Sequence, residues 1–257
     1  MVRRVCDAPE PQGMVDKRWQ VRVAQEAGLS VPRVWLDPAA VDTFPVLIKP
    51  ILGGGGAGIR PAADAQELAE QWRVAAAAGG PHFVQQRVHG RTMHVGGVAK
   101  QGLPVVIAAY EGDGPAEFGQ ISSGRLLPDP AAVSAARQFL GAAGYTGIFC
   151  FDFIRTESGE HYFLEVNPRI FGSWMTLQLG GVDLVTGYLY ALGLSEPPPS
   201  PSPDYTTTWE LKHPTDASTG QVLRAGVARV RTMRPFIGWR GSAVMLVDLV
   251  AHVRRTR

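Results

Sequence analysis

Three side chains that carry oxygen ligands, Asp152, Glu165 and Asn167, lie in two neighbouring and largely apolar runs of the sequence. Residues 148–154 and 161–167 both alternate in the way that successive side chains alternate between the two faces of a β-strand. The alternation predicts two strands, and it places Asp152 on the face opposite the phenylalanines of its own run.

The segment between the two runs predicts how they pair. Ser158-Gly159 is its best turn centre, and a two-residue loop there would make a hairpin in which Asp152 lies opposite Glu165. By the same alternation we expect Phe163 to share a face with Glu165 and Asn167.

Directly opposed residues of a hairpin lie ~5 Å apart on the same face. Two ionised carboxylates at that distance repel each other, so one would take up a proton unless a cation lay between them. Asn167 adds a neutral oxygen, and such a set of hard oxygen ligands suits magnesium. The residues alone leave two alternatives: the ordinary charged face of a solvated hairpin, and a basic partner such as Arg169. The apolar flanks favour a buried hairpin, in which carboxylates need a partner, and we favour the metal.

The run Glu165-Val-Asn-Pro-Arg169, which follows an Asp-bearing strand, resembles the metal-binding hairpin of the ATP-grasp superfamily. Its continuation through residues 170–174 and 181–183 resembles a carboxylate–amine ligase-like branch. The resemblance covers most of residues 16–195. It implies an α+β fold in which two subdomains clasp ATP together with Mg²⁺, or Mn²⁺, and it implies the metal ligands Asp152, Glu165 and Asn167.

The resemblance also implies residues for the nucleotide. Lys49 resembles the family's phosphate-contacting lysine, and the glycine-rich loop after it resembles a flap whose backbone N–H groups fold over a triphosphate. Residues 82–90 resemble the strand and hinge that line the adenine. The implied nucleotide-binding residues are Lys17, Lys49, Gly54, Gly55, Gly56, Gln85, Gln86 and Val88. Lys49 and Arg169 are the implied catalytic residues, Arg169 because it can hold a phosphate or a carboxylate bidentately.

Each of these assignments has a plainer alternative. Lys49 could be a strand-end lysine that reaches water, and Gln86 could be a surface residue of its strand. Many relatives carry acidic residues near Gln86 and at Thr92, whereas both side chains are uncharged here. His94 lies on a predicted strand, and because a lone histidine is more often structural we assign it no role.

Composition excludes several classes of protein. The chain has 257 residues, 45% of them hydrophobic, and a net charge of +2, which gives no sign of nucleic-acid binding. Two cysteines, Cys6 and Cys150, do not make a disulfide framework. No signal peptide and no apolar run of membrane-spanning length is present, so a cytoplasmic location is expected.

We expect four segments: 1–43, a lead-in and entry helix; 44–88, the small subdomain with the glycine flap; 89–195, the large subdomain with the metal-binding hairpin; and 196–257, a Pro-rich connector and C-terminal segment. The predicted helices are 16–27, 64–78, 129–143, 172–179, 184–192 and 243–254. The other predicted strands are 44–50, 82–88, 93–99, 103–110 and 205–211. Residues 111–128 show no periodicity and are expected to form a mobile loop near the site.

The implied activity is that of an ADP-forming ligase, which activates a small-molecule carboxylate as an acyl phosphate for attack by an amine. A carboxylase-like use of bicarbonate is also open, although no biotin-specific feature is evident. The rival is a non-catalytic or partner-dependent nucleotide-binding module. Relatives usually place a substrate domain before the entry helix, and only residues 1–15 precede it here. We therefore expect that the C-terminal segment supplies that wall of the cleft, that a partner chain or domain does, or that the chain is truncated, and we favour an incomplete or partner-dependent enzyme.

Overall fold

The structure is a computed structural model that describes residues 13–53, 56–112, 123–206 and 208–210. The chain divides into two compact units, Met1–Thr208 and Trp209–Arg257, and nearly all of the described residues belong to the first. Within the described ranges no helix has both the length and the apolar character that a membrane crossing requires. The predicted helix at 243–254 and the flap residues Gly54 and Gly55 lie outside the described residues.

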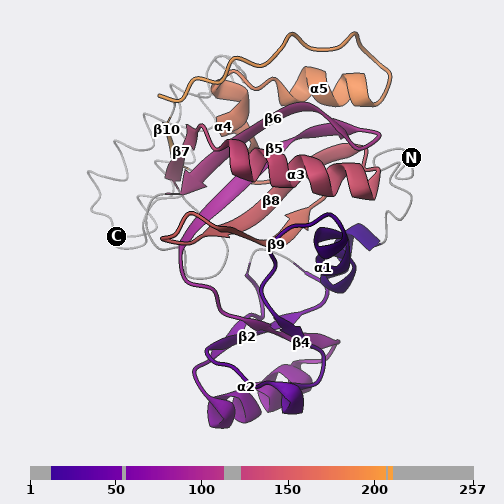
Figure 1. Cartoon of the computed structure of the whole chain (residues 1–257). Coiled ribbons are helices and arrows are strands. Elements are labelled where there is room, and N and C mark those ends of the chain that lie inside the picture. Colours follow the sequence, from indigo (N-terminus) through magenta and orange to yellow (C-terminus); the bar gives the residue numbers. More distant parts are fainter. Residues whose placement is uncertain (1–12, 54–55, 113–122, 207, 211–257) are drawn as a thin grey trace, which may run out of the picture. The chain divides into compact units, whose positions relative to one another are not determined.

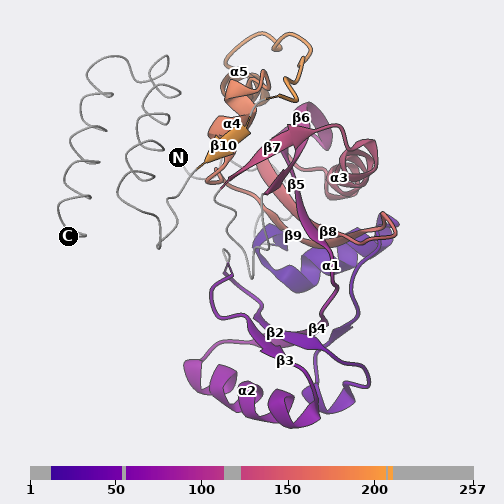
Figure 2. The ribbon, with the colours of Figure 1, turned by 90° about the vertical axis from the view of Figure 1, so that its left-hand side faces the viewer.

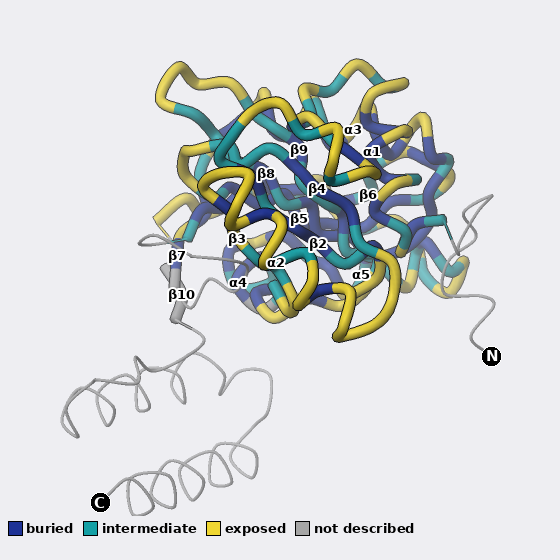
Figure 3. The backbone as a smooth tube through the Cα atoms, turned by 90° about the horizontal axis from the view of Figure 1, so that it is seen from below, coloured by how far each residue is buried: buried dark blue, intermediate teal, exposed yellow. Residues whose placement is uncertain are grey.

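A small antiparallel sheet has the strand order β1-β4-β2-β3. Its elements are β1 (Val34–Trp35), β2 (Val46–Pro50), β3 (Arg60–Ala62) and β4 (His82–Gln86), with the helix α2 (Ala65–Ala78) packed along it (Figure 1). α2 contributes Leu68 and Ala75 to a buried cluster with Val46, Ile48 and Val84. Its remaining turns are largely exposed, whereas the strands β5 (Arg91–Lys100) and β8 (Gly147–Arg155) of the larger sheet are largely buried (Figure 3).

The larger sheet contains, in order, β7-β6-β5-β8-β9, and each neighbouring pair is antiparallel. Its strands are β5 (Arg91–Lys100), β6 (Leu103–Gly112), β7 (Ser123–Leu127), β8 (Gly147–Arg155) and β9 (His161–Asn167). The helices α1 (Lys17–Glu26) and α3 (Pro130–Ala143) lie on one face, and α4 (Trp174–Leu179) and α5 (Leu184–Ala191) on the other (Figures 1 and 2). The 3-10 turns Gly13–Val15 and Pro38–Ala40 and the strand β10 (Thr208–Glu210) complete the described elements.

Aspartates fix the starts of the three longest helices. The side chain of Asp16 accepts from the Arg18 N–H at the start of α1, and Asp64 and Asp129 cap α2 and α3 in the same way. A short acceptor at this position satisfies one of the N–H groups that the first helical turn leaves unpaired. These caps account for the agreement between the predicted and observed starts of all three helices.

Aromatic side chains fill the space between the hairpin β8–β9 and α3. Phe139 of α3 lies 5.3 Å from Phe151 and 5.3 Å from Phe163, measured between ring centroids. Both strand residues are 0% exposed, as are Phe149 and Phe153. Burial of each ring contributes about 1.5–3 kcal/mol. This packing holds one face of the hairpin rigid and thereby fixes the side chains of its opposite face.

The hairpin places Asp152 directly opposite Glu165, as the sequence predicted. Its turn is different, because residues 156–160 separate the two strands. Gly159 in this loop has a φ of 88°, a conformation that glycine adopts without strain. The two-residue loop predicted at Ser158-Gly159 is therefore wrong.

A bulge between Asp152 and Phe153 explains why the pairing is nevertheless correct. It shifts the register by one residue and so offsets the longer turn. The same bulge brings Phe163 opposite Phe153, where it is fully buried. The prediction that Phe163 shares a face with Glu165 and Asn167 is wrong, because the extra residue of the bulge reverses the alternation.

The described ends of the segment 111–128 differ from the prediction of a mobile loop. Residues 111 and 112 continue β6, and residues 123–127 form β7, which pairs with it. The sequence Ser-Gly-Arg-Leu-Leu of β7 has no alternation that would mark a strand. Residues 113–122, which connect the two strands, lie outside the described part of the chain.

Candidate functional site

Four side chains form a row across the large sheet. Tyr110 pairs with His94, His94 with Asp152, and Asp152 with Glu165, so β6, β5, β8 and β9 each contribute one member. Residues directly opposite each other point to the same face, here the face away from the aromatic core. The sheet thus sets two carboxylates and a histidine side by side.

Asn167 and His94 hold the two carboxylates in place. The Asn167 amide donates to Asp152 Oδ2 at 3.2 Å and to Glu165 Oε1 at 3.3 Å. His94 Nδ1 lies 2.6 Å from Asp152 Oδ1. The side chains of Asp152 and Glu165 are 19% and 14% exposed, so a narrow opening to solvent remains. The three predicted metal ligands therefore meet at one place.

α1 supplies the positive charge closest to Glu165. Lys17 Nζ lies 3.4 Å from Glu165 Oε2, and it donates to the Gly53 carbonyl at 2.5 Å. One turn later the Gln20 side chain donates to the Val166 carbonyl at 2.8 Å and accepts from its N–H at 3.0 Å. Gln20 thereby pairs the open edge of β9 and aligns α1 with the hairpin. Lys17 joins the glycine loop to the carboxylates.

The carboxylate pair lacks sufficient positive charge of its own. Burial raises the pKa of Glu165 above its usual value, and the charge of Asp152 raises it further. Lys49, Lys17 and the Asn167 hydrogen bond act in the opposite direction without cancelling the rise. A cation between the two carboxylates would remove this penalty.

Lys49 is 3% exposed, which excludes the alternative of a lysine that reaches water. Its ammonium donates to Gln85 Oε1 at 3.0 Å. Burial lowers the pKa of Lys49, while the charges of Glu165 and Asp152 raise it. Because the field of both carboxylates acts on this ammonium, Lys49 belongs to the same site.

Gln85 and Gln86 are neighbours with different surroundings. Gln85 is buried, and its Nε2 has no hydrogen-bond partner among the residues that the structure describes. Such a donor suits an acceptor atom of a ligand. The Gln86 side chain is half-buried, and its Oε1 accepts a hydrogen bond from the Arg33 backbone N–H at 3.4 Å. An ordinary strand residue would make such a contact. Val88 lies half-buried just after β4.

Arg169 is exposed beside the carboxylates. Its guanidinium donates to the Ile170 carbonyl at 3.2 Å and lies 3.5 Å from Asn167 Oδ1. The alternative that Arg169 neutralises the carboxylates is not supported, since His94 is the partner of Asp152 and Lys17 that of Glu165. Arg169 is placed to hold an anion next to the cluster.

His94 is the residue that sequence reasoning missed. Its side chain is 5% exposed, its ring stacks on Tyr110 at 5.0 Å, and its Nε2 has no partner in the described part of the chain. Tyr110 in turn has its hydroxyl 2.7 Å from Ser173 Oγ. Alternation put His94 on a strand, but no local signal showed that this strand would pair with the one that carries Asp152.

The donor set fits a hard divalent cation. Two facing carboxylates provide charged oxygens, and rotation of the Asn167 amide by half a turn would present its oxygen to them. His94, Cys150 and Asp152 also have ligand atoms within 4.8 Å of one another, a set that suits softer metals. Burial, however, raises the pKa of the Cys150 thiol well above its usual value, which disfavours the thiolate such a metal needs.

Comparison with known proteins identifies the family of this chain. A family model described as an ATP-grasp domain matches residues 14–173. Among curated proteins, a biotin carboxylase of Nostoc sp. is 29% identical over 207 residues, which cover 69% of this chain and 46% of the relative. A pyruvate carboxylase of Aspergillus niger is 28% identical over 171 residues, 57% of this chain and 14% of that protein.

Solved structures show the same fold. The biotin carboxylase domain of Hydrogenobacter thermophilus 2-oxoglutarate carboxylase aligns with a TM-score of 0.62 and 22% identity, over 74% of this chain and 48% of that one. An L-amino acid ligase from Bacillus licheniformis aligns with a TM-score of 0.55 and 18% identity, over 71% and 48%. The chain spans about half the length of these relatives, and less of the Aspergillus protein. With the family model matching more than half of its residues, this chain belongs to the ATP-grasp family.

Proposed function

We propose that this chain binds Mg-ATP at the row formed by Asp152 and Glu165 and transfers the γ-phosphoryl group to a carboxylate, giving an acyl phosphate that an amine attacks. The observation that carries the proposal is the meeting of two carboxylates and Asn167 with two buried lysines, Lys17 and Lys49. Such a site has oxygen ligands for a metal and cations for phosphates, as phosphoryl transfer requires.

The chemistry needs no protein nucleophile. An oxygen of the acid substrate attacks the γ-phosphorus, the bond from that phosphorus to the bridging oxygen breaks, and ADP leaves. The amine nitrogen then attacks the acyl carbon, inorganic phosphate leaves, and the nitrogen loses a proton. A carboxylate is a poor electrophile, and the phosphate gives it a leaving group.

The residues of this chain would bind and orient the reactants. Asp152, Glu165 and Asn167 would hold Mg²⁺, which would stabilise the charge that develops on the transferring phosphoryl group. Lys49 and Lys17 would neutralise phosphate oxygens. Arg169 would hold the acid substrate bidentately beside the metal.

Two of the relatives support parts of this proposal. The Hydrogenobacter domain was solved in complex with MgADP and bicarbonate, which supports a nucleotide–metal site in the shared fold. The Bacillus protein is named an L-amino acid ligase. Gln85 adds support from this chain itself, because its unpaired Nε2 offers a donor to the base beside Lys49.

A second candidate is a carboxylase in which bicarbonate is the phosphorylated acid. The observation that favours it is that both curated relatives named above are carboxylases. The first chemical step would be the same at the same residues. The two candidates differ in the acid and in the acceptor of the activated carbon.

The test is Mg²⁺-dependent ADP formation with hydroxylamine present, since hydroxylamine converts acyl phosphates to stable hydroxamates. A ligase should form hydroxamate and ADP with an organic acid. If bicarbonate, and no organic acid, stimulated ADP formation, the carboxylase would be favoured. If the chain bound Mg-ATP but formed no ADP with any acid, the proposal of catalysis would be wrong, and a non-catalytic nucleotide-binding module would remain. Glu165→Gln is the negative control.

A further inference from the structure

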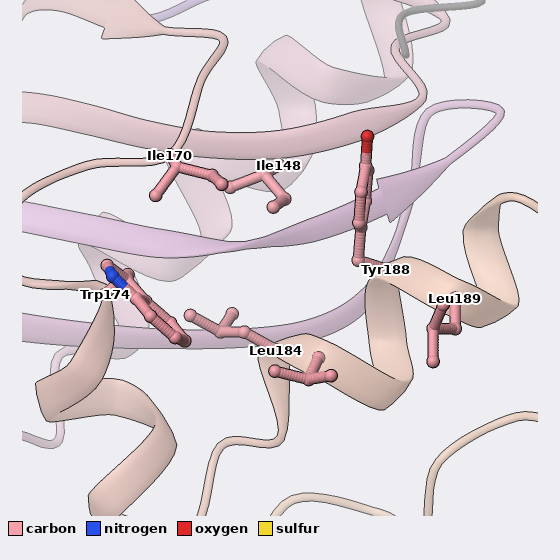
Figure 4. A pocket seen from close by; sticks show the side chains of 7 residues that line it. Ile148, Ile170, Trp174, Leu184, Tyr188 and Leu189 are labelled. Atoms are coloured by element: carbon pink, nitrogen blue, oxygen red, sulfur yellow. The ribbon is translucent and has the colours of Figure 1, made fainter. Parts of the chain in front are cut away.

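An apolar pocket lies at the edge of the large sheet, close to Arg169. Its volume is about 160 Å³. Figure 4 shows it between Ile148 and Ile170 on one side and the helices α4 and α5 on the other (Figure 4). The lining residues are Ile148, Ile170, Trp174, Leu184, Tyr188 and Leu189, with Val185 beside them.

The end of β9 creates this pocket. Ile148 lies on the same face of β8 as Cys150 and Asp152, and Cys150 is the partner of the last residue of β9, Asn167. Beyond that pair β9 no longer covers the edge of β8. The chain turns away there, and Ile170 becomes a wall of the pocket.

The pocket and the carboxylate cluster lie on the same face of β8, a short distance apart. Same-face neighbours on a strand are about 7 Å apart, so Ile148 lies one such step from the Cys150–Asn167 pair. The Arg169 guanidinium contacts both Asn167 Oδ1 and the Ile170 carbonyl, and so it bridges the two places. A molecule with a carboxylate at Arg169 could extend into the pocket.

The volume of the pocket and its uncharged lining limit the kinds of ligand that it can hold. An apolar cavity of about 150 Å³ holds a molecule the size of benzene. None of the seven lining side chains carries a charge, so the lining offers no carboxylate to pair with an ammonium group. Ile170 and Val185 are 63% and 50% exposed, so the pocket has an apolar opening to solvent.

We infer that this pocket holds the apolar body of the acid substrate, whose carboxylate is bound by Arg169. The substrate class is a carboxylic acid with an aromatic or branched aliphatic group of about six carbons. The inference rests on the proposed function. It adds which acid the site selects.

The test compares two acids, 3-phenylpropanoate and acetate, in the ADP and hydroxamate assays. Val185→Trp would fill the opening from an exposed position of α5. Loss of an apolar subsite changes discrimination at least as much as one methylene group does, so kcat/KM for 3-phenylpropanoate relative to acetate should fall by about tenfold or more. The control is Leu103→Trp, an apolar position in another part of the large sheet that is 73% exposed against 50% for Val185, where the ratio should not change.

A binding measurement separates the two hypotheses. Titration of 3-phenylpropanoate should change the fluorescence of Trp174, a signal that Trp174→Phe removes and Val185→Trp weakens. If acids turn over but Val185→Trp leaves the ratio unchanged, the pocket inference is wrong and the proposed function stands. If no acid turns over but the acid still binds and Val185→Trp weakens that binding, the pocket inference stands and the proposed reaction fails. A pocket that binds no acid, or whose filling changes only the oligomeric state, overturns the inference.

Discussion

His94 Nδ1 and Asp152 Oδ1 lie 2.6 Å apart across two neighbouring strands of the large sheet. This contact occupies one carboxylate oxygen and leaves the other directed at Asn167 and Glu165. A side chain that orients a metal ligand from behind in this way commonly accounts for 10–100-fold in metal affinity.

We therefore expect His94→Gln to weaken Mg²⁺ binding by about 10–100-fold while ATP still saturates the protein at high Mg²⁺. The measurement is a titration of Mg²⁺ at fixed ATP. His89→Gln, at an exposed position, is the control and should behave as the wild type. An unchanged Mg²⁺ requirement in His94→Gln would mean that His94 is only a packing residue.

The raised pKa of Glu165 predicts that this residue lowers the free energy of unfolding of the metal-free protein increasingly as the pH rises. A carboxyl whose folded pKa exceeds its unfolded value stabilises the fold while it is protonated, and this contribution is lost as the pH rises through the folded value. Glu165→Gln should therefore gain stability relative to the wild type as the pH rises from about 4.5 towards neutrality. Urea unfolding over this range without metal measures it. A difference that stays constant with pH would contradict the assignment.

Lys49 should be a binding residue that the fold tolerates losing. Its burial lowers its pKa, so a neutral side chain of similar shape removes a desolvation cost. We expect Lys49→Met to keep or raise the melting temperature and to weaken ATP binding by about tenfold or more. Calorimetric titration with ATP and Mg²⁺ measures the affinity, and Arg22→Ala, an exposed cation on α1, is the control. Equal ATP affinity in Lys49→Met and wild type would remove Lys49 from the site.

Replacing Phe163 tests whether the aromatic packing against α3 holds the hairpin β8–β9 in place. It is 0% exposed and lies 5.3 Å from Phe139, so Phe163→Ala should cost about 3–5 kcal/mol of unfolding free energy. The neighbouring Tyr162, which is half-buried on the other face, should cost much less when replaced by alanine. Urea unfolding of both variants decides this, and similar costs would show that the aromatic packing is not what fixes β9.

The hairpin shows what the sequence could predict and why some details were wrong. Alternation located both strands, and the pairing of Asp152 with Glu165, which the structure confirms, was predicted from a two-residue turn at Ser158-Gly159. The five-residue turn and the bulge were both missed. The predicted pair was nevertheless correct, because the two features shift the register by one residue in opposite directions, and the shifts cancel at Asp152. Between the bulge and the turn the prediction was wrong, so Phe163 lies on the face opposite to the predicted one.

Contacts between distant segments could not be predicted in the same way. His94 reaches Asp152 only because β5 lies between β6 and β8, an order that local pattern does not encode. Gln20 pairs with the open edge of β9 across 146 residues of sequence. The resemblance pointed to Lys17 and Lys49, which the structure places near the carboxylates, because it carries information on the whole fold that periodicity lacks. Their roles in nucleotide binding stay a prediction.

The most direct measurement is calorimetric titration of ATP into the wild type and into Glu165→Gln, each with Mg²⁺ and with a chelator. If the row of Asp152 and Glu165 holds the metal of Mg-ATP, Mg²⁺ should strengthen ATP binding to the wild type by about tenfold or more and should have little effect on the variant. Equal Mg²⁺ dependence in the two proteins, or wild-type binding that does not depend on Mg²⁺, would contradict the metal site at this hairpin.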